Sequence, residues 1–366
     1  MNRLQLIISW VFAVQGIMAQ SPYISRVFEY VPAPGQFVNV APEWEEGDDA
    51  EAMRRKAEEN LANHNNQMIT LGGWGGYVTF GFDHMVKNLR GRYDFKIVGN
   101  AIYSTSDWND NSRMGGSAEP GIVLVSHDDN GNGLPDDPWY ELAGSEYRNP
   151  LTKHDYVCTY YRPAADHVAV RDPEDKFITD TAYVRWKDNY GGEGHVKKVS
   201  FNRQNYYPNW VTADSLTFSG ERLPDNGVDE RAQGNNYVLY CYDWGYADNH
   251  PNDPKFGTDD ESVPEHLRHV SEFKIDWAVD GEGKRVWLPG IHFVKVYTGV
   301  NQFNGWIGEV STEVQDAWDL HLLDANGKAV TEEEEEDEPS PYDLDGDGWL
   351  TIDDIMELIR IYLAPS

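Results

Sequence analysis

The chain has few cysteines and few basic residues, and both shortages narrow the class of protein. Only Cys158 and Cys241 occur among 366 residues, which argues against a thiolate metal site. Both lie in aromatic, strand-like runs, where one disulfide and two buried free thiols are equally compatible with the sequence. There are 30 Lys and Arg against 62 Asp and Glu, so the formal net charge is −32. That charge argues against nucleic acid and anionic membranes as partners.

Long apolar runs are also missing, except at the N-terminus. Residues 4–14 read LQLIISWVFAV, after the positive charge of Arg3 and shortly before Ala19. This run is too short for a stable membrane span and is typical of an export signal. We expect cleavage after Ala19, no lipid anchor at a nearby cysteine, and a secreted or cell-surface protein without a transmembrane segment.

Sequence motifs of the common enzyme classes are absent as well. There is no nucleophile elbow, no zinc-protease helix, no phosphate loop and no dinucleotide fingerprint. Glycoside hydrolysis needs only two carboxylates that flank the scissile bond. Four carboxylates are candidates for such a pair: Glu119, Glu141, Asp276 and Glu309. Because an acidic chain always offers some pair, the sequence assigns no catalytic residue.

The pattern from Met68 to about Leu323 predicts the fold. Short alternating runs rich in aromatic and β-branched residues are divided by Gly, Asn, Asp and Pro. They predict a mainly β protein, an antiparallel β-sandwich of jelly-roll-like type. One N-terminal helix is expected at 49–64, with Asp49 as a possible N-cap. A doubly wound α/β fold would need a helix after most strands, and such helices are missing.

Changes of composition divide the chain into five segments. These are a signal peptide (1–19), an extended segment with the helix (20–67), the β-sandwich body (68–330), an acidic linker (331–341) and a C-terminal calcium loop–helix module (342–366). The linker, TEEEEEDEPSP, should be extended, because its like charges repel and its prolines stiffen it.

The most specific motif lies in the last segment, which reads DLDGDGWLTIDD from residue 343 to 354. The positions of a twelve-residue calcium loop fall on Asp343, Asp345, Asp347, Trp349 (by its carbonyl), Thr351 and Asp354. Gly348 occupies position 6, where the turn is sharp. This spacing predicts a Ca²⁺ site, because six to eight oxygen ligands can surround one ion.

The loop has an exiting helix only, since Pro339 and Pro341 prevent a helix from leading into it. A loop of this kind that closes with Asp, not Glu, resembles one repeat of a dockerin. The resemblance covers 343–363 and implies a module that docks to a protein partner when Ca²⁺ is bound. Dockerins normally carry two such repeats, and this chain shows one.

A second calcium-like run lies within the body, HDDNGNGLPDDPWYEL at 127–142. Its candidate ligands are Asp128, Asn130, Asn132 and Asp136. Amides replace two carboxylates here, which predicts a weaker or more structural Ca²⁺ site that pins a long loop. The alternative is a hydrogen-bonded Asx turn without an ion.

Several stretches of the body carry a second resemblance. They are 71–84 (LGGWGGYVTFGFDH), 93–103 (YDFKIVGNAIY), 115–147 and 273–322. They resemble a family of exported bacterial surface proteins with a jelly-roll-like body. The resemblance implies a role in surface binding, and some relatives are associated with the capture of glycans or of corrinoids such as vitamin B12.

Aromatic residues are abundant, with 13 Trp, 21 Tyr and 13 Phe. Tryptophans in loop-like contexts are Trp74, Trp108, Trp139, Trp210, Trp244 and Trp306. A large sandwich needs such rings in its core, and sugars or a corrinoid could stack on those that are exposed. Trp108 and Trp244 are the best ligand-binding candidates, because polar groups surround them in SDWNDN and YDWGYADN.

These observations favour one functional hypothesis over two alternatives. The first is a secreted or surface-exposed calcium-binding protein that binds a ligand non-covalently and docks through its C-terminal module. The second is a dockerin-bearing secreted carbohydrate hydrolase of polysaccharide catabolism. The third is a corrinoid-binding accessory of outer-membrane uptake.

Overall fold

The computed structural model describes residues 20–104, 114–234, 236–252 and 267–323. The chain divides into two units, Met1–Ala329 and Val330–Ser366, and all described residues belong to the first. The predicted signal peptide, Trp108, the linker and the C-terminal calcium loop lie outside the described residues. Within the described part, no helix has both the length and the apolar character to cross a bilayer.

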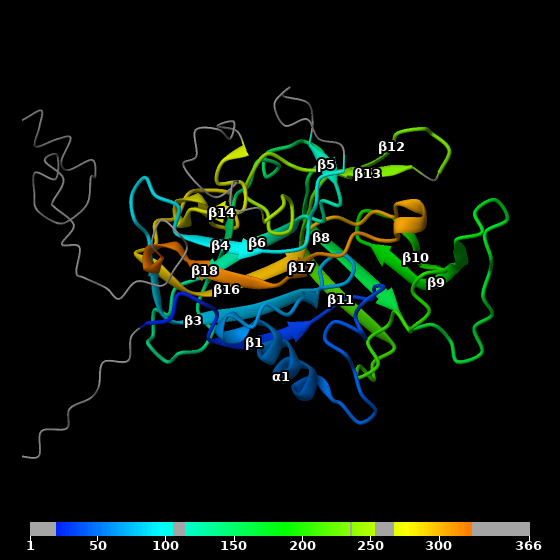
Figure 1. Cartoon of the computed structure of the whole chain (residues 1–366), viewed down its shortest axis with the longest axis horizontal. Helices are drawn as coiled ribbons and strands as arrows, with labels where there is room; N and C mark the ends of the chain where they lie inside the picture. Colours follow the sequence, from blue (N-terminus) through cyan, green and yellow to red (C-terminus); the bar gives the residue numbers. More distant parts are fainter. Residues whose placement is uncertain (1–19, 105–113, 235, 253–266, 324–366) are drawn as a thin grey trace, which may run out of the picture. The chain divides into compact units, whose positions relative to one another are not determined.

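The largest element is an antiparallel six-stranded sheet with the order β1-β3-β16-β6-β7-β15 (Figure 1). Its strands are β1 (Arg26–Val31), β3 (Tyr77–Lys87), β16 (Gly290–Thr298), β6 (Gly121–Ser126), β7 (Trp139–Leu142) and β15 (Ala278–Val279). Alternation of side chains gives this sheet two different faces. Val78 and Phe80 of β3 enter the main core, whereas Tyr77 and Thr79 point to the opposite face. We call that opposite face the outer face.

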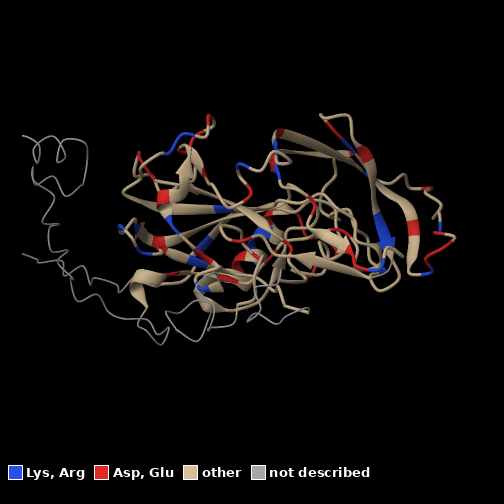
Figure 2. Ribbon diagram, turned by 90° about the horizontal axis from the view of Figure 1, so that it is seen from above, with Lys and Arg blue, Asp and Glu red and all other residues tan. Residues whose placement is uncertain are grey.

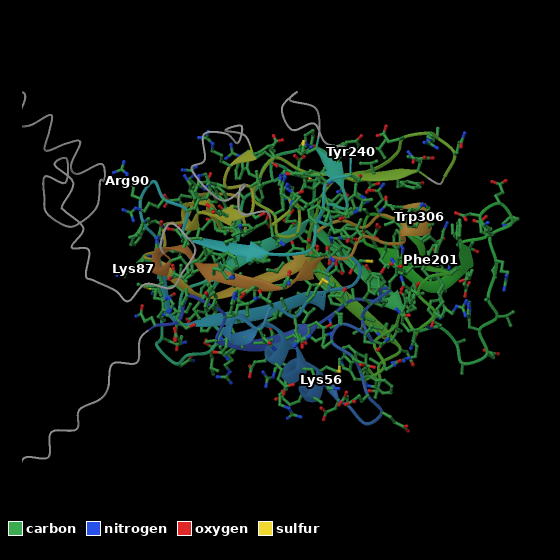
Figure 3. All side chains as sticks on the ribbon, in the orientation of Figure 1. Lys56, Lys87, Arg90, Phe201, Tyr240 and Trp306 are labelled. Atoms are coloured by element: carbon green, nitrogen blue, oxygen red, sulfur yellow. The ribbon has the colours of Figure 1, made fainter. Side chains whose placement is uncertain are left out.

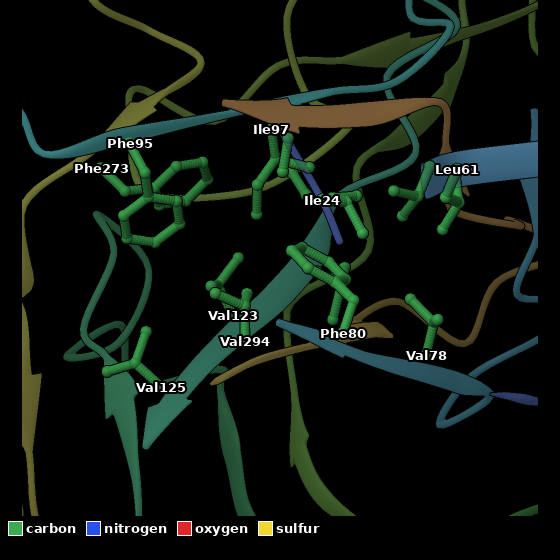
Figure 4. Packing of buried hydrophobic residues seen from close by; sticks show 14 of the residues in the cluster. Ile24, Leu61, Val78, Phe80, Phe95, Ile97, Val123, Val125, Phe273 and Val294 are labelled. Carbon is green, nitrogen blue, oxygen red and sulfur yellow. The ribbon is translucent and has the colours of Figure 1, made fainter. Parts of the chain in front are cut away.

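A second layer covers the inner face. It consists of a small sheet and the helix α1 (Ala50–Leu61). The order of the small sheet is β14 (Glu272–Phe273), β4 (Phe95–Val98) and β18 (Asp316–Asp319). The rings of Phe95 and Phe273 stack with centroids 5.2 Å apart, above Val123 and Val294 of the large sheet (Figure 4). Two β layers packed on a shared apolar core form a sandwich, as the alternating pattern predicted.

The helix forms where the sequence predicted it. The Asp49 side chain accepts a hydrogen bond of 2.8 Å from the N–H of Ala52 and so caps the first turn. Met53, Ala57 and Leu61 follow at a spacing of four residues, and all three are buried in the main core. Since β1 also pairs with β3, the N-terminal segment contributes both a strand and a helix to the sandwich.

A four-stranded sheet is built from one continuous stretch of chain. Its order is β10 (Glu193–Val199), β9 (Ile178–Asp188), β8 (Lys153–Tyr161) and β11 (Ser215–Arg222). It has an aromatic core of its own, which includes Trp74, Tyr156, Tyr160 and Phe218. Trp74 lies shortly before β3 in the chain. Its ring therefore connects this aromatic core, which we call the second core, to the outer face of the six-stranded sheet.

The remaining strands are short. β12 (Gly227–Asp229), β13 (Tyr237–Tyr240) and β5 (Gly115–Gly116) form one sheet, and β17 (Glu313–Val314) pairs with β2 (Ile69–Thr70). Single 3₁₀ turns lie at η1 (Ala62–His64), η4 (Ile275–Trp277), η5 (Gly305–Ile307) and η6 (Leu320–Leu322).

The two cysteines are free thiols. Cys158 is buried in the aromatic core of the four-stranded sheet, where burial raises the pKa of its thiol to about 12. Cys241 is half-buried and packs in a different region, between the side chains of Met114 and Leu239 and their neighbours. Of the two alternatives from the sequence, the structure therefore has the free thiols.

Candidate functional site

A cleft of about 960 Å³ opens on the outer face of the six-stranded sheet. Strands β3, β16, β6 and β7 supply its floor, and β11 of the four-stranded sheet borders it from the other side. The loop at 279–283 and the segment at 147–155 supply the remaining walls. A concave site of this size where two sheets meet is a typical place for a ligand.

The strand register places a row of side chains along the floor. Glu29 pairs with Thr79, Thr79 with Lys295, Lys295 with Leu124, and Leu124 with Glu141. Residues directly opposite each other on neighbouring strands share one face of the sheet. The row therefore crosses β1, β3, β16, β6 and β7 and ends at Glu141.

Lys295 organises the aromatic part of the floor. Its ammonium nitrogen lies 4.6 Å from the ring centroid of Tyr77 and 5.0 Å from that of Trp139. It also forms an ion pair of 3.3 Å with Glu29, which receives a hydrogen bond of 2.8 Å from the Thr79 hydroxyl. The ammonium group of Lys295 thus holds both rings in place, and the carboxylate of Glu29 compensates its charge.

The surroundings of Glu141 favour its protonated form. It projects from β7 into the cleft and is half-buried. Burial raises its pKa to about 8, and the negative charge of Glu221 contributes to the shift. At pH 7 this side chain can therefore donate a proton or a hydrogen bond.

Glu221 lies on β11, where the register shifts between Gly220 and Arg222. Its N–H donates a hydrogen bond of 2.8 Å to the Tyr297 hydroxyl, and its carbonyl accepts one of 3.1 Å from the Trp74 indole. A Cβ at Gly220 would lie 2.8 Å from the Tyr297 hydroxyl oxygen, so glycine permits this close approach.

The Glu221 carboxylate forms an ion pair with His154. Burial raises the pKa of Glu221, and the charge of His154 opposes that effect. The two glutamates of the cleft therefore differ in their surroundings. Glu141 has the carboxylate of Glu221 as a neighbour, whereas Glu221 lies beside both the imidazole of His154 and the carboxylate of Asp155.

Carboxylates dominate the rest of the lining. Asp155, Asp280 and Glu282 join the two glutamates, and the basic groups are Arg148, His154 and Lys295. Lys295 and His154 are already paired with Glu29 and Glu221. Over the described part of the chain, Asp and Glu are spread along strands and loops and not gathered on one side (Figure 2). The cleft itself thus disfavours anionic ligands.

A second group of carboxylates lies in the interior, where Asp248 and Glu313 are buried and Glu119 is half-buried. Oxygens of Glu119, Asp248 and Glu313 lie within 4.8 Å of one another. Backbone N–H groups satisfy two of them, that of Ser311 to Glu119 and that of Glu313 to Asp248, each at 2.9 Å. Burial raises the pKa of all three groups, so protonated and hydrogen-bonded acids account for the arrangement. The oxygens are close enough together to bind a cation. Because they already accept hydrogen bonds, this cluster is a weak candidate for a metal site.

The calcium-like run at 127–142 forms an exposed loop between β6 and β7. Asp128 accepts the N–H groups of Asn132 (3.1 Å) and Gly133 (2.8 Å). The amide groups of Asn130 and Asn132 donate to Asp136 at 3.1 and 3.2 Å. The structure therefore brings all four predicted side chains together. These bonds are those of the Asx-turn alternative, and Ca²⁺ binding here stays a prediction.

The tryptophans take different positions. Trp74 is fully buried, Trp210 packs beside Tyr30, and Trp139 lines the cleft. Trp306 is 42% exposed and lies beside Phe201, with ring centroids 6.1 Å apart (Figure 3).

The predicted ligand contact Trp244 lies outside the cleft lining. It is 39% exposed, and its ring centroid is 4.6 Å from that of Trp277. It belongs to a surface cluster of rings in which Trp277 also contacts Tyr93. The ring in the cleft is Trp139, which the sequence placed among the loop-like tryptophans without distinguishing it.

Of the four carboxylates considered for catalysis, only Glu141 lines the cleft. Glu119 lies in the interior cluster, and Glu309 is 6% exposed. Asp276 accepts a hydrogen bond of 3.1 Å from Asn88. Glu221 was missed, because nothing in the local sequence SGER distinguishes this glutamate from the many others.

Comparison with known proteins adds no family: no family model matches the chain, and no curated protein matches it.

Proposed function

We propose that this is an exported surface protein whose β-sandwich binds a neutral glycan in the outer-face cleft. The observation that carries the proposal is the floor, where Lys295 fixes the rings of Tyr77 and Trp139 next to carboxyl groups. The apolar face of a sugar ring stacks on a flat aromatic side chain, and its hydroxyls hydrogen-bond to neighbouring carboxyl groups. The excess of carboxylates in the lining favours neutral over acidic sugars.

Replacement of Trp139 by alanine should weaken glycan binding about 30-fold, which corresponds to about 2 kcal/mol for a buried aromatic contact. The measurement is calorimetric titration with a neutral oligosaccharide selected on a glycan array. Trp287→Ala is the matched control, since Trp287 is 52% exposed and does not line the cleft. Equal affinities for wild type and Trp139→Ala would reject the cleft as the site.

A corrinoid could use the same aromatic floor, and the titration distinguishes the two ligand classes. Cyanocobalamin is added in place of the oligosaccharide under identical conditions. If wild type binds cobalamin tightly and binds no glycan, and if Trp139→Ala loses the cobalamin binding, then the ligand of the cleft is a corrinoid and not a glycan.

We also propose that Ca²⁺ orders two loops, one at 128–136 and one at 343–354. The first would pin the loop that leads into Trp139, since β7 begins at that residue. The second would order the C-terminal module for docking to a protein partner, as the dockerin resemblance implies. The support is the ligand spacing in both sequences and, for the first loop, the convergence of its four side chains.

Calorimetry with Ca²⁺ tests both loops. Wild type should bind two ions, Asp343→Ala/Asp347→Ala should lose one of them, and Asp128→Ala should lose the other. Each carboxylate lost from a loop removes a charged oxygen ligand, so the affinity should fall below detection. Asp166→Ala serves as a control for charge, because Asp166 is exposed and lies outside both loops. Two sites of unchanged affinity in the Asp343/Asp347 variant would disprove the C-terminal assignment.

A further inference from the structure

Two glutamates of the cleft come from different sheets and stand in different electrostatic surroundings. Glu141 projects from β7 on the floor, and Glu221 projects from β11 on the opposite border. Their charges interact, as the effect of Glu221 on the pKa of Glu141 shows. Burial raises the pKa of both groups, and only Glu221 has a partner, His154, that opposes the rise. Two carboxyl groups that face one cleft from different sheets are the usual equipment for acid–base chemistry at a glycosidic bond.

Glu141 suits the role of proton donor. Its carboxyl group makes no hydrogen bond or ion pair to another residue of the described chain, and it lines the open volume of the cleft. Lys295, the charged group next to it in the floor row, is paired with Glu29 and so does not neutralise Glu141. The acid is therefore available to a ligand that enters the cleft.

Glu221 suits the role of base, because it is held from three sides. Its N–H is fixed to Tyr297 of the floor, its carbonyl to Trp74 of the second core, and its carboxylate to His154. Burial raises the pKa of this carboxyl group, and the His154 partner acts against that rise. His154 acts on it as a positioning residue.

We propose that Glu141 and Glu221 make the cleft a hydrolytic site for neutral glycosides. The inference rests on the proposed function, since it requires that a glycan binds in this cleft. The Glu141 carboxyl gives its proton to the glycosidic oxygen while the bond from that oxygen to the anomeric carbon breaks. The Glu221 carboxylate accepts a proton from a water whose oxygen bonds to the anomeric carbon. One glycoside and one water thus yield two alcohol-bearing products, and proton exchange with solvent restores both side chains.

The remainder of the cleft agrees with this assignment. Trp139 and Glu141 lie two residues apart on β7 and so share one face of the sheet, which places a sugar stacked on this ring next to the acid. Tyr77 and Tyr297 also line the floor, and the Tyr297 hydroxyl accepts the hydrogen bond from the Glu221 N–H. Of the carboxylates considered from the sequence, Glu119 and Glu309 lie in the interior and Asp276 is bonded to Asn88, so Glu141 alone lines the cleft.

The test uses the full-length protein and the neutral oligosaccharide that binds in the calorimetric titration. Wild type should release shorter products, and Glu141→Gln and Glu221→Gln should each lower kcat at least 100-fold with a Kd within a few-fold of wild type. Glu174→Gln is the matched control, an exposed carboxylate outside the cleft, and should turn over like wild type. Glutamine is a close match to the neutral acid at Glu141, so this variant should fold normally.

Chemical rescue separates a catalytic from a structural effect. With the 2,4-dinitrophenyl glycoside of the same sugar, Glu141→Gln should lose far less activity than with the oligosaccharide, because this leaving group needs no proton. Azide should restore part of the activity of Glu221→Gln, because azide attacks without a base.

Three results would overturn the inference. Binding without turnover by wild type would reject hydrolysis and leave the proposed binding function intact. Turnover of the oligosaccharide at the wild-type rate in Glu141→Gln would reject the assignment of the pair. Absence of both binding and turnover would reject the proposed function together with the inference. Should Glu221→Gln fail to fold, the leaving-group comparison on Glu141→Gln decides the assignment by itself.

Discussion

Replacement of Trp74 by alanine is expected to lower the free energy of unfolding by about 3–5 kcal/mol, the usual cost of removing a buried tryptophan. Trp74 is fully buried, and its ring contacts that of Tyr156 at a centroid distance of 4.6 Å. Its backbone carbonyl also accepts a hydrogen bond of 3.0 Å from the Tyr160 hydroxyl. The substitution would leave a cavity that the surrounding rings can fill only in part.

The same substitution should also weaken ligand binding, because the Trp74 indole N–H holds the carbonyl of Glu221 at the border of the cleft. Trp74→Phe is the matched control, since it refills much of the volume but cannot donate that hydrogen bond. Stability is measured by urea unfolding and binding by calorimetry. We expect Trp74→Phe to recover most of the stability and less of the affinity. A loss below about 1 kcal/mol in Trp74→Ala would contradict the buried role of this ring.

The second large effect is expected at Glu313 and depends on pH. Burial raises the pKa of this side chain from 4.5 to about 7, although hydrogen bonds from Thr70 and Ser311 oppose the shift. Between these two values, the folded protein keeps a proton that the unfolded chain has released. Stability is therefore fully present below about pH 4.5 and is lost as the pH rises to about 7, by about 3 kcal/mol for this group.

Glu313→Gln should remove the part of this dependence that Glu313 contributes, because glutamine stays neutral at every pH, whereas Glu119 and Asp248 keep theirs. The variant should be more stable than wild type at pH 8 by up to about 3 kcal/mol and similar to it at pH 4.5. Urea unfolding across this range measures the difference. Glu193→Gln serves as a control, since Glu193 is an exposed carboxylate paired with Arg185. A pH slope as steep in Glu313→Gln as in wild type would show that Glu313 does not carry the effect.

The sequence predicted the parts of the fold that depend on local periodicity. The alternation in YVTFGFD places Val78, Phe80 and Phe82 on one face of β3, and all three are in the main core. The cap at Asp49 and the four-residue spacing of Met53 and Ala57 likewise determine the helix locally. Such features require only the preferences of neighbouring residues.

The cleft could not be predicted in this way, because its residues meet through strand pairings distant in sequence. Lys295 reaches Tyr77 and Trp139 only because β16 lies between β3 and β6. Glu221 depends on contacts with Trp74 and Tyr297, far from it in the chain. The composition supplied many carboxylates, and only the register of the sheets selects Glu141 among them.

The four-stranded sheet has a consequence for how this protein can diversify. Strands β8 to β11 follow one another from Lys153 to Arg222, between β7 and β12, so they form one insertion in the order of the sandwich. This insertion supplies β11 and one border of the cleft, whereas the floor belongs to the sandwich itself. If the cleft binds the proposed glycan, exchange of this single contiguous segment would change one border of the site while the floor and the main core keep their sequence. Recombination could thus change specificity in one step, with the scaffold inherited unchanged.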